Sequence, residues 1–126
     1  DQCLLHHRDT LMQMQYFDLK EFDCQETGTN EMNPFFLEKL DYLRHQCGFP
    51  FKITSGYRDP SHSIEARKTR PGTHARGIAA DIKINSGSEG YVIVREAMKM
   101  GFGGIGIAKN FIHVDVRDTV QVIWTY

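Results

Sequence analysis

The chain has 126 residues, of which 40% are hydrophobic, and a formal net charge of −1 at pH 7. A chain of this size can bury one core and form one domain. The near-neutral charge excludes the strongly basic surface of a typical nucleic-acid-binding protein, and no apolar run approaches the ~18 residues of a membrane-spanning helix. Residues 1–8 lack the layout of a secretory signal, and the sequence leaves the localisation open.

Three cysteines, Cys3, Cys24 and Cys47, make an odd number that does not indicate a disulfide framework. A disulfide between Cys24 and Cys47 is one possibility in an oxidising compartment, but the sequence does not give their separation. No motif surrounds any of the three thiols. Buried or incidental cysteines are therefore preferred over a thiol nucleophile.

The first half of the chain predicts one helix and one strand. Asn33-Pro34 is typical of an N-cap followed by a proline at the first helical position, and an apolar stripe continues until Cys47-Gly48. Residues 51–55 predict a strand that leads into Gly56-Tyr57-Arg58. Residues 59–71 predict a polar, proline-bounded loop that could border a cleft.

The second half predicts strands on either side of another helix. Residues 72–82 pass from a glycine-punctuated turn into an apolar strand, and a helix is predicted from Ser88 to near Gly101. Residues 111–116 alternate with a period of two, and residues 120–124 predict a last strand. The run 103–106 lacks the glycine spacing of a nucleotide-binding loop, so we interpret its glycines as clearance for the backbone near a site.

Two histidines and an aspartate form the most informative pattern of the sequence. His74 lies in the predicted turn, Asp81 in the strand that follows it, and His113 in the strand 111–116. Two imidazoles and one carboxylate suit Zn²⁺, and three protein ligands leave a fourth position for water, as in catalytic zinc sites. The alternative is that His113 and Asp115, which share one strand face, lie on the solvated side of a sheet. Three candidate ligands in one consistent frame favour the zinc site.

Three segments resemble, in order and spacing, the zinc D-Ala-D-Ala carboxypeptidase family of cell-wall peptidases. They are residues 54–58 (Thr-Ser-Gly-Tyr-Arg), residues 74–82 and residues 111–117. The resemblance implies an α+β fold, with a small, mostly antiparallel sheet and helices packed on one side in a single compact domain. Residues 1–15 would then be an N-terminal extension, and residues 16–126 the carboxypeptidase-like domain. One zinc ion would be held by His74, Asp81 and His113.

The resemblance also implies roles for residues around the zinc. Arg58 is the candidate for stabilising an oxyanion or clamping a substrate carboxylate, and the alternative is a surface arginine paired with Asp59. Many family members carry an acidic residue where this chain has Asn110. Asp115 is therefore the candidate for the general base or for the carboxylate that orients a zinc ligand. The candidate substrate-binding residues are Ser55, Tyr57 and His62, the last of which has a solvated loop histidine as its alternative.

Two functions are compatible with these residues. The first is a monomeric, zinc-dependent peptidase that hydrolyses peptide bonds in peptidoglycan stem peptides, as a D-Ala-D-Ala carboxypeptidase or a cell-wall endopeptidase acting at the bacterial wall. The short single domain also resembles lytic peptidases of bacteriophages. The second is a non-catalytic, zinc-stabilised binding module, because the scaffold is similar to the signalling domain of Hedgehog proteins. The departure at Asn110 is the best argument for the second function.

Overall fold

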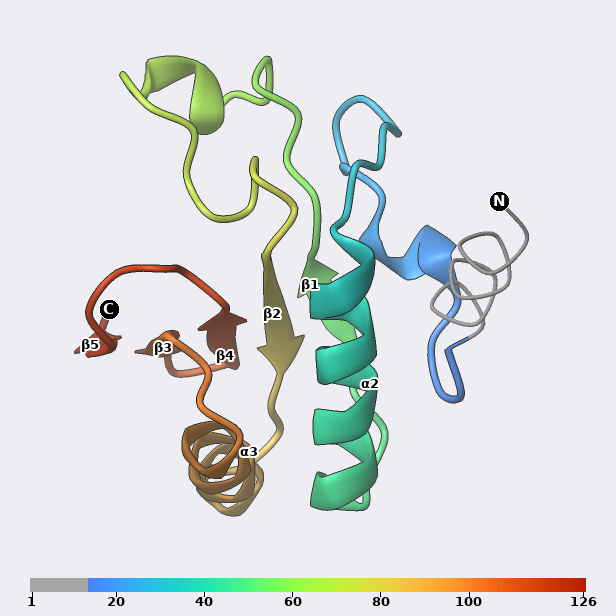
Figure 1. Ribbon diagram of the computed structural model, residues 1–126, viewed down its shortest axis with the longest axis vertical. Coiled ribbons are helices and arrows are strands. Elements are labelled where there is room, and N and C mark those ends of the chain that lie inside the picture. The colour runs from blue at the N-terminus through green and yellow to red at the C-terminus, as the bar shows by residue number, and fades with distance from the viewer. Residues whose placement is uncertain (1–13) are drawn as a thin grey trace.

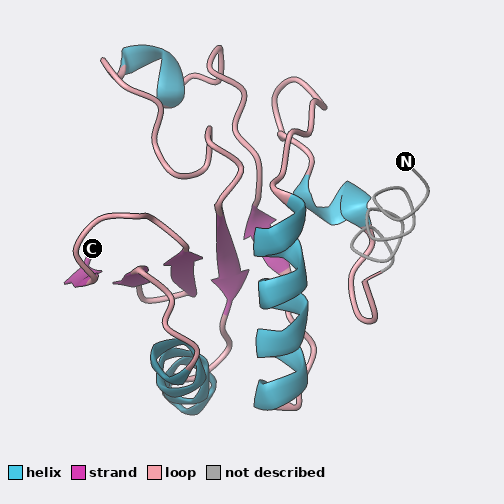
Figure 2. Ribbon diagram, viewed as in Figure 1, coloured by secondary structure: helices cyan, strands magenta, loops and turns pink. Residues whose placement is uncertain are grey.

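The computed structural model describes residues 14–126, which form one five-stranded sheet with two α-helices and two short 3₁₀ helices (Figures 1 and 2). The strands lie in the order β1-β2-β4-β3-β5, and every pair is antiparallel except β3 and β5. This arrangement confirms the α+β fold expected from the sequence. The helices are η1 (Leu19–Phe22), α2 (Pro34–Cys47), η2 (Glu65–Arg67) and α3 (Gly87–Lys99). The strands are β1 (Ile53–Ser55), β2 (Ala79–Lys83), β3 (Gly104–Ile107), β4 (Phe111–Asp115) and β5 (Val122–Thr125). Within the described residues, no helix is both long and apolar enough to span a bilayer.

Helix α2 has the boundaries that its capping residues predict. The side chain of Asn33 accepts hydrogen bonds from the backbone N–H groups of Phe35 and Phe36. Pro34, at the first helical position, has no backbone N–H that would need an acceptor. Gly48 ends the helix with φ = 78°, a left-handed conformation that glycine adopts without steric cost. Helix α3 is capped by Ser86, whose side chain accepts from the backbone of Glu89, and it begins at Gly87, one residue before the predicted start.

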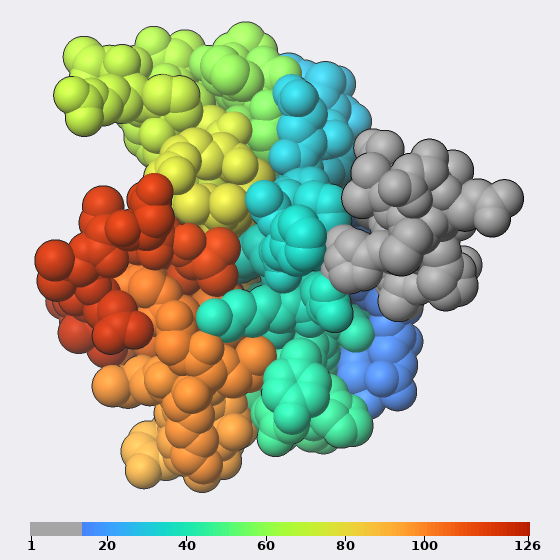
Figure 3. All heavy atoms as spheres, viewed as in Figure 1, coloured from blue at the N-terminus to red at the C-terminus, as the bar shows by residue number. Residues whose placement is uncertain are grey.

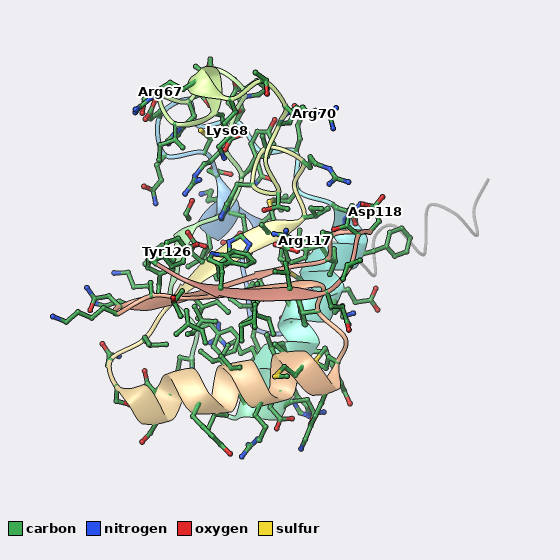
Figure 4. The ribbon with its side chains drawn as sticks, turned by 90° about the vertical axis from the view of Figure 1, so that its left-hand side faces the viewer. Arg67, Lys68, Arg70, Arg117, Asp118 and Tyr126 are labelled. Carbon is green, nitrogen blue, oxygen red and sulfur yellow. The ribbon has the colours of Figure 1, made fainter. Side chains whose placement is uncertain are left out.

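The core lies between the two α-helices and one face of the sheet. Figure 4 shows the sheet nearly edge-on, with α3 beneath it and the loop that carries η2 on the opposite side. Alternate strand residues point into the core, and Ile82, Ile112 and Val114 are almost completely buried there. They pack with buried residues of α2 and α3, namely Phe36, Leu37, Leu40, Leu43, Ile93 and Ala97.

The opposite face of the sheet carries polar residues in register. Asp81 on β2 is the Cα partner of His113 on β4, His113 is the partner of Gly106 on β3, and Gly106 is the partner of Trp124 on β5. The connection between β1 and β2, residues 56–78, rises over this face. In Figure 3 it forms the yellow-green lobe, and a hollow separates it from the red C-terminal segment below.

The structure holds the cysteines of the described region as free thiols. Cys24 is buried in the core, and Cys47 lies half-buried at the end of α2, with its Sγ 4.0 Å from the carbonyl of Val92. The possible Cys24–Cys47 disulfide is therefore absent from this structure. Cys3 falls outside the described residues.

Candidate metal centre

His74 is held at the edge of the sheet by the turn in which it lies. Its carbonyl accepts hydrogen bonds from the backbone of Arg58 (3.2 Å) and of Gly77 (3.2 Å), which anchors the turn to the end of β1. The Nδ1 atom of His74 lies 2.8 Å from the carbonyl oxygen of Gly56. Because a carbonyl can only accept, Nδ1 carries the proton and Nε2 presents its lone pair. That Nε2 lies 3.3 Å from Oδ1 of Asp81.

Asp81 and His113 meet because they are partners across adjacent antiparallel strands. Nδ1 of His113 lies 3.1 Å from Oδ1 of Asp81, and its Nε2 lies 2.7 Å from Oδ2 of Asp115. An ionised Asp115 can only accept, so Nε2 of His113 carries the proton in the neutral ring. Both imidazoles then direct lone pairs toward the same oxygen of Asp81.

These three groups have the chemistry of a cation site. One ligand atom from each of His74, Asp81 and His113 lies within 4.8 Å of the others, and all three side chains are buried. With neutral imidazoles, three electron-pair donors face one another in a buried space, an arrangement that a cation stabilises. Each histidine also gives its other ring N–H to a protein oxygen, as zinc-binding histidines usually do. The residues therefore fit Zn²⁺.

Electrostatics in the metal-free centre point the same way. Burial opposes ionisation of Asp81, but its close contacts with His113 and His74, and the positive charge that these imidazoles carry when protonated, outweigh it and hold the pKa of this carboxyl well below its usual range. Burial opposes a charge on His113 too, and contacts with Asp115 and Asp81 nevertheless raise the pKa of its imidazole. Protonation of His113 is thus favoured when no metal is bound.

Asp115 is completely buried beside His113, and its oxygens are occupied. Besides His113, it accepts from the backbone N–H, Nε and Nη2 of Arg117 at 3.1, 2.9 and 2.7 Å. Burial would raise the pKa of this carboxyl, but these donors hold it well below its usual range. Gly104 on β3 makes the room, since a Cβ at that position would collide with the Asp115 carboxylate. The glycine run thus provides the clearance that the sequence indicates.

A cleft of about 550 Å³ opens over these residues. Arg58 lines it, with Nη2 3.8 Å from Asp81 and Nη1 3.9 Å from the buried Glu65. The structure therefore places Arg58 beside the candidate metal ligands, and no ion pair with Asp59 is seen among the described residues. Cationic and aromatic side chains also line the cleft: Lys68, Arg76, Arg117, Phe111, Trp124 and Tyr126.

The three predicted substrate-binding residues lie outside the residues that line this cleft. Ser55 is the Cα partner of Asp81 at the end of β1. Tyr57 is buried, and its hydroxyl donates a 3.1 Å hydrogen bond to Glu31. His62 lies in the loop with Nε2 3.3 Å from Glu26. Their roles stay predictions, and the geometry offers them no direct contact with the cleft.

Sequence reasoning assigned no role to Arg117, Trp124 or Tyr126, which line the cleft. Figure 4 labels Arg117 and Tyr126 on the side of the sheet opposite α3. Arg117 continues the period of two that joins His113 and Asp115, a signal that was available in the sequence. Trp124 reaches the site only because β5 pairs in parallel with β3, and no local pattern predicts this pairing.

Comparison with known families agrees with this geometry. No curated protein matches the sequence significantly. One family model, described as Peptidase M15, matches residues 14–115, a span that contains Arg58, all three candidate metal ligands and Asp115. The family is one of zinc-dependent metallopeptidases. The chain belongs to the peptidase M15 family.

Proposed function

We propose that this protein is a zinc-dependent peptidase that hydrolyses peptide bonds in the stem peptides of peptidoglycan. The observation that carries the proposal is the convergence of His74, Asp81 and His113 at the base of a cleft lined by cationic side chains. Membership of the M15 family supports hydrolysis as the reaction. The choice of stem peptides rests on the family resemblance and on the charge of the cleft.

His74, Asp81 and His113 would hold the zinc ion. When bound in such a site, zinc polarises a carbonyl group and lowers the pKa of water toward about 7. Arg58 contributes a fixed positive charge at the same place, because its guanidinium lies over Asp81 and faces the cleft. It is positioned to pair with negative charge that develops on a substrate oxygen.

Asp115 is better suited to orienting His113 than to accepting a proton from substrate or water. Its side chain is fully buried, and three donors of Arg117 together with His113 occupy its oxygens. A general base must reach the proton that it removes. We assign Asp115 to orienting the His113 ring. It accepts the hydrogen bond from Nε2, which leaves Nδ1 as the atom that would bind zinc.

The charge of the cleft favours a substrate with carboxylates. Residues 56–78 contain five Lys and Arg and two Asp and Glu, so this segment has a net charge of +3 in a chain of net charge −1. Three of its cations, Arg58, Lys68 and Arg76, line the cleft. Stem peptides, which carry a free terminal carboxylate, suit a cleft of this charge.

The test is digestion of purified peptidoglycan by the zinc-loaded protein, with mass analysis of the released fragments. We expect release of D-Ala or stem peptides that stops when a chelator removes the metal and resumes when Zn²⁺ is restored. The variant His74→Ala should release nothing, whereas His45→Ala, on α2, should retain the activity. Release that continues in the presence of chelator would contradict the proposal.

A second candidate function is a zinc-stabilised binding module. Asn110, which cannot exchange protons at neutral pH, favours it, and this residue lies exposed in the connection between β3 and β4. Saturable binding of peptidoglycan fragments by the zinc-loaded protein, with no fragment cleaved, would establish the binding module and exclude the peptidase.

A further inference from the structure

We propose that Arg117 and Trp124 are positioning residues that fix the imidazole of His113 in its metal-binding orientation. The two side chains complete a closed ring of contacts that runs from His113 through Asp115, Arg117 and Trp124 and returns to His113. The inference rests on the zinc site of the proposed function and is independent of which peptide bond is cut. Both residues lie beyond residue 115, where the family match ends, so membership of the family does not assign them this role.

Asp115 and Arg117 form the first half of the ring. His113 donates from Nε2 to Oδ2 of Asp115 at 2.7 Å, and Arg117 grips both oxygens of that carboxylate through Nε at 2.9 Å and Nη2 at 2.7 Å. A two-point contact of this kind fixes the plane of the carboxylate as well as its position. Arg117 therefore sets the direction of the Nε2–H bond of His113 indirectly, through Asp115.

Trp124 forms the second half of the ring. Its indole centroid lies 5.0 Å from that of the His113 imidazole, and the guanidinium carbon of Arg117 lies 5.0 Å from the indole centroid. The contact with Arg117 is a cation–π interaction, and the contact with His113 limits rotation of the imidazole about its Cβ–Cγ bond. The indole of Trp124 thus contacts both His113 and Arg117, the residue that orients Asp115.

Glycines of β3 make the space that the ring needs. Gly106 lies between His113 and Trp124 in the register of the sheet, and a Cβ at this position would lie 2.7 Å from Cε2 of Trp124. Gly104 leaves similar room for Asp115 and Arg117. Since a side chain at either position would push one member of the ring out of place, the absence of side chains there is part of the arrangement.

The experiment compares zinc affinity, measured by competition with a chromophoric chelator, with the melting temperature of each metal-free variant. Removing a residue that orients a metal ligand typically lowers affinity by about 10-fold to 100-fold, and we expect a loss in this range for Arg117→Ala and for Trp124→Ala. Arg117→Lys, which keeps the charge without the two-point contact, should lower zinc affinity less than Arg117→Ala. Trp124→Phe, which keeps an aromatic ring, should lower it less than Trp124→Leu. Gly106→Ala should lower the affinity without removing any member of the ring.

Matched controls are available on the other side of the sheet. Arg95 on α3 makes the same types of contact as Arg117, with Nε 2.8 Å from Glu96 and its guanidinium 5.9 Å from the Tyr91 ring. Arg95→Ala should leave zinc affinity unchanged. Gly87→Ala should do the same, because a Cβ at Gly87 meets nothing within 4 Å.

The outcomes separate a positioning role from a structural one. The inference would be overturned if the variants of Arg117 and Trp124 bind zinc as tightly as the wild type. This holds whether their melting temperature is lower than that of the wild type or unchanged. A wild type that binds no zinc would overturn both the inference and the proposed function. Zinc binding that depends on Arg117 and Trp124 in a protein that cuts no peptide would support the inference and contradict the proposed function.

Discussion

Protonation of His113 competes with metal binding at the centre. Burial alone would lower the pKa of its imidazole, but the contacts with Asp115 and Asp81 raise it above the ordinary value of about 6.5. A raised pKa in the folded protein stabilises the fold below the unfolded value, and this contribution is lost as the pH rises through the folded value. Zinc needs the neutral ring, so metal binding must displace this proton.

Opposite pH dependences follow for the two forms of the protein. The stabilisation that His113 gives to the metal-free protein should be present at pH 6 and lost toward higher pH, whereas zinc affinity should rise over the same range. The midpoint of the affinity change should lie above about 6.5, the value of an unperturbed histidine. Chelator competition and thermal melting across this range measure both trends. Zinc affinity that does not change with pH would contradict the assignment of His113 as a ligand.

A single substitution tests the assignment of Asp115 to orienting His113 against the role of general base. Asp115→Asn retains the shape of the side chain but removes its charge and the two-point partner of Arg117. If Asp115 orients His113, zinc affinity should fall by about 10-fold to 100-fold and activity should recover at saturating zinc. If Asp115 is the general base, zinc should stay bound while kcat falls. Measuring kcat as a function of zinc concentration decides between these outcomes.

At the residue scale, the sequence predicted the three candidate ligands because each lies in a short local pattern. His113 and Asp115 share a face through the period of two in β4, which holds in the structure. Trp124 was not predicted, because its contact with His113 depends on β5 pairing in parallel with β3. The buried acid Glu65 was not predicted either, since it is held by Lys68 and by the backbone of Gly72 within an irregular loop.

At the scale of elements, the turn that carries His74 is tied to the start of α2. The backbone N–H of Asn33, the N-cap of this helix, donates to the carbonyl of Gly77 at 2.9 Å. Gly77 has φ = 73°, and a Cβ at this position would collide with the carbonyl oxygen of Glu31. The turn can therefore accept only glycine here, which links the position of His74 to that of the helix.

Two glycine substitutions test this link. Gly48→Ala, at the end of α2, places alanine at φ = 78° with nothing within 4 Å of its Cβ, and should cost about 1–2 kcal/mol of unfolding free energy. Gly77→Ala carries the same backbone penalty together with the collision, so it should cost more and should also weaken zinc binding. Denaturant unfolding and chelator competition measure the two effects. Equal costs and equal zinc affinities for the two variants would show that the turn is not tied to α2.

Element boundaries were predictable where local chemistry sets them. Asn33, Pro34 and Gly48 fix α2 by themselves, and the structure has the predicted boundaries. The glycines of the run 103–106 were interpreted as clearance for the backbone and no strand was predicted there, but residues 104–107 form β3. Its glycines lower the propensity for a strand, and pairing with β4 and β5 on its two sides overcomes this.

At the scale of the whole molecule, charge is separated between the lobe and the rest of the chain. The segment 56–78 carries +3 in a chain of −1, so the other residues together carry −4. The positive lobe forms one wall of the cleft and the sheet forms the other (Figure 3). Such a separation attracts an anionic substrate to the cleft and repels it from the remaining surface.

Reversing one charge at the cleft should change the recognition of anionic peptides. Arg76 is 45% exposed, and its ion pair with Asp118 is 3.8 Å long, so Arg76→Glu should fold normally. Arg76→Glu should raise KM several-fold for a peptide with a free carboxylate and should change KM less for the amidated form of the same peptide. The increase should be smaller at high salt. Lys99→Glu, an equal charge change on the outer side of α3, is the control and should leave KM unchanged. Equal effects of the two variants would show that only net charge matters.

The zinc centre is the central claim, and calorimetric titration of Zn²⁺ into the metal-free protein tests it most directly. We predict one zinc ion per chain, with binding abolished or greatly weakened in His74→Ala, Asp81→Asn and His113→Ala, and retained in His45→Ala. Absence of binding by the wild type, or equal binding by the variants of all three ligands, would contradict the account.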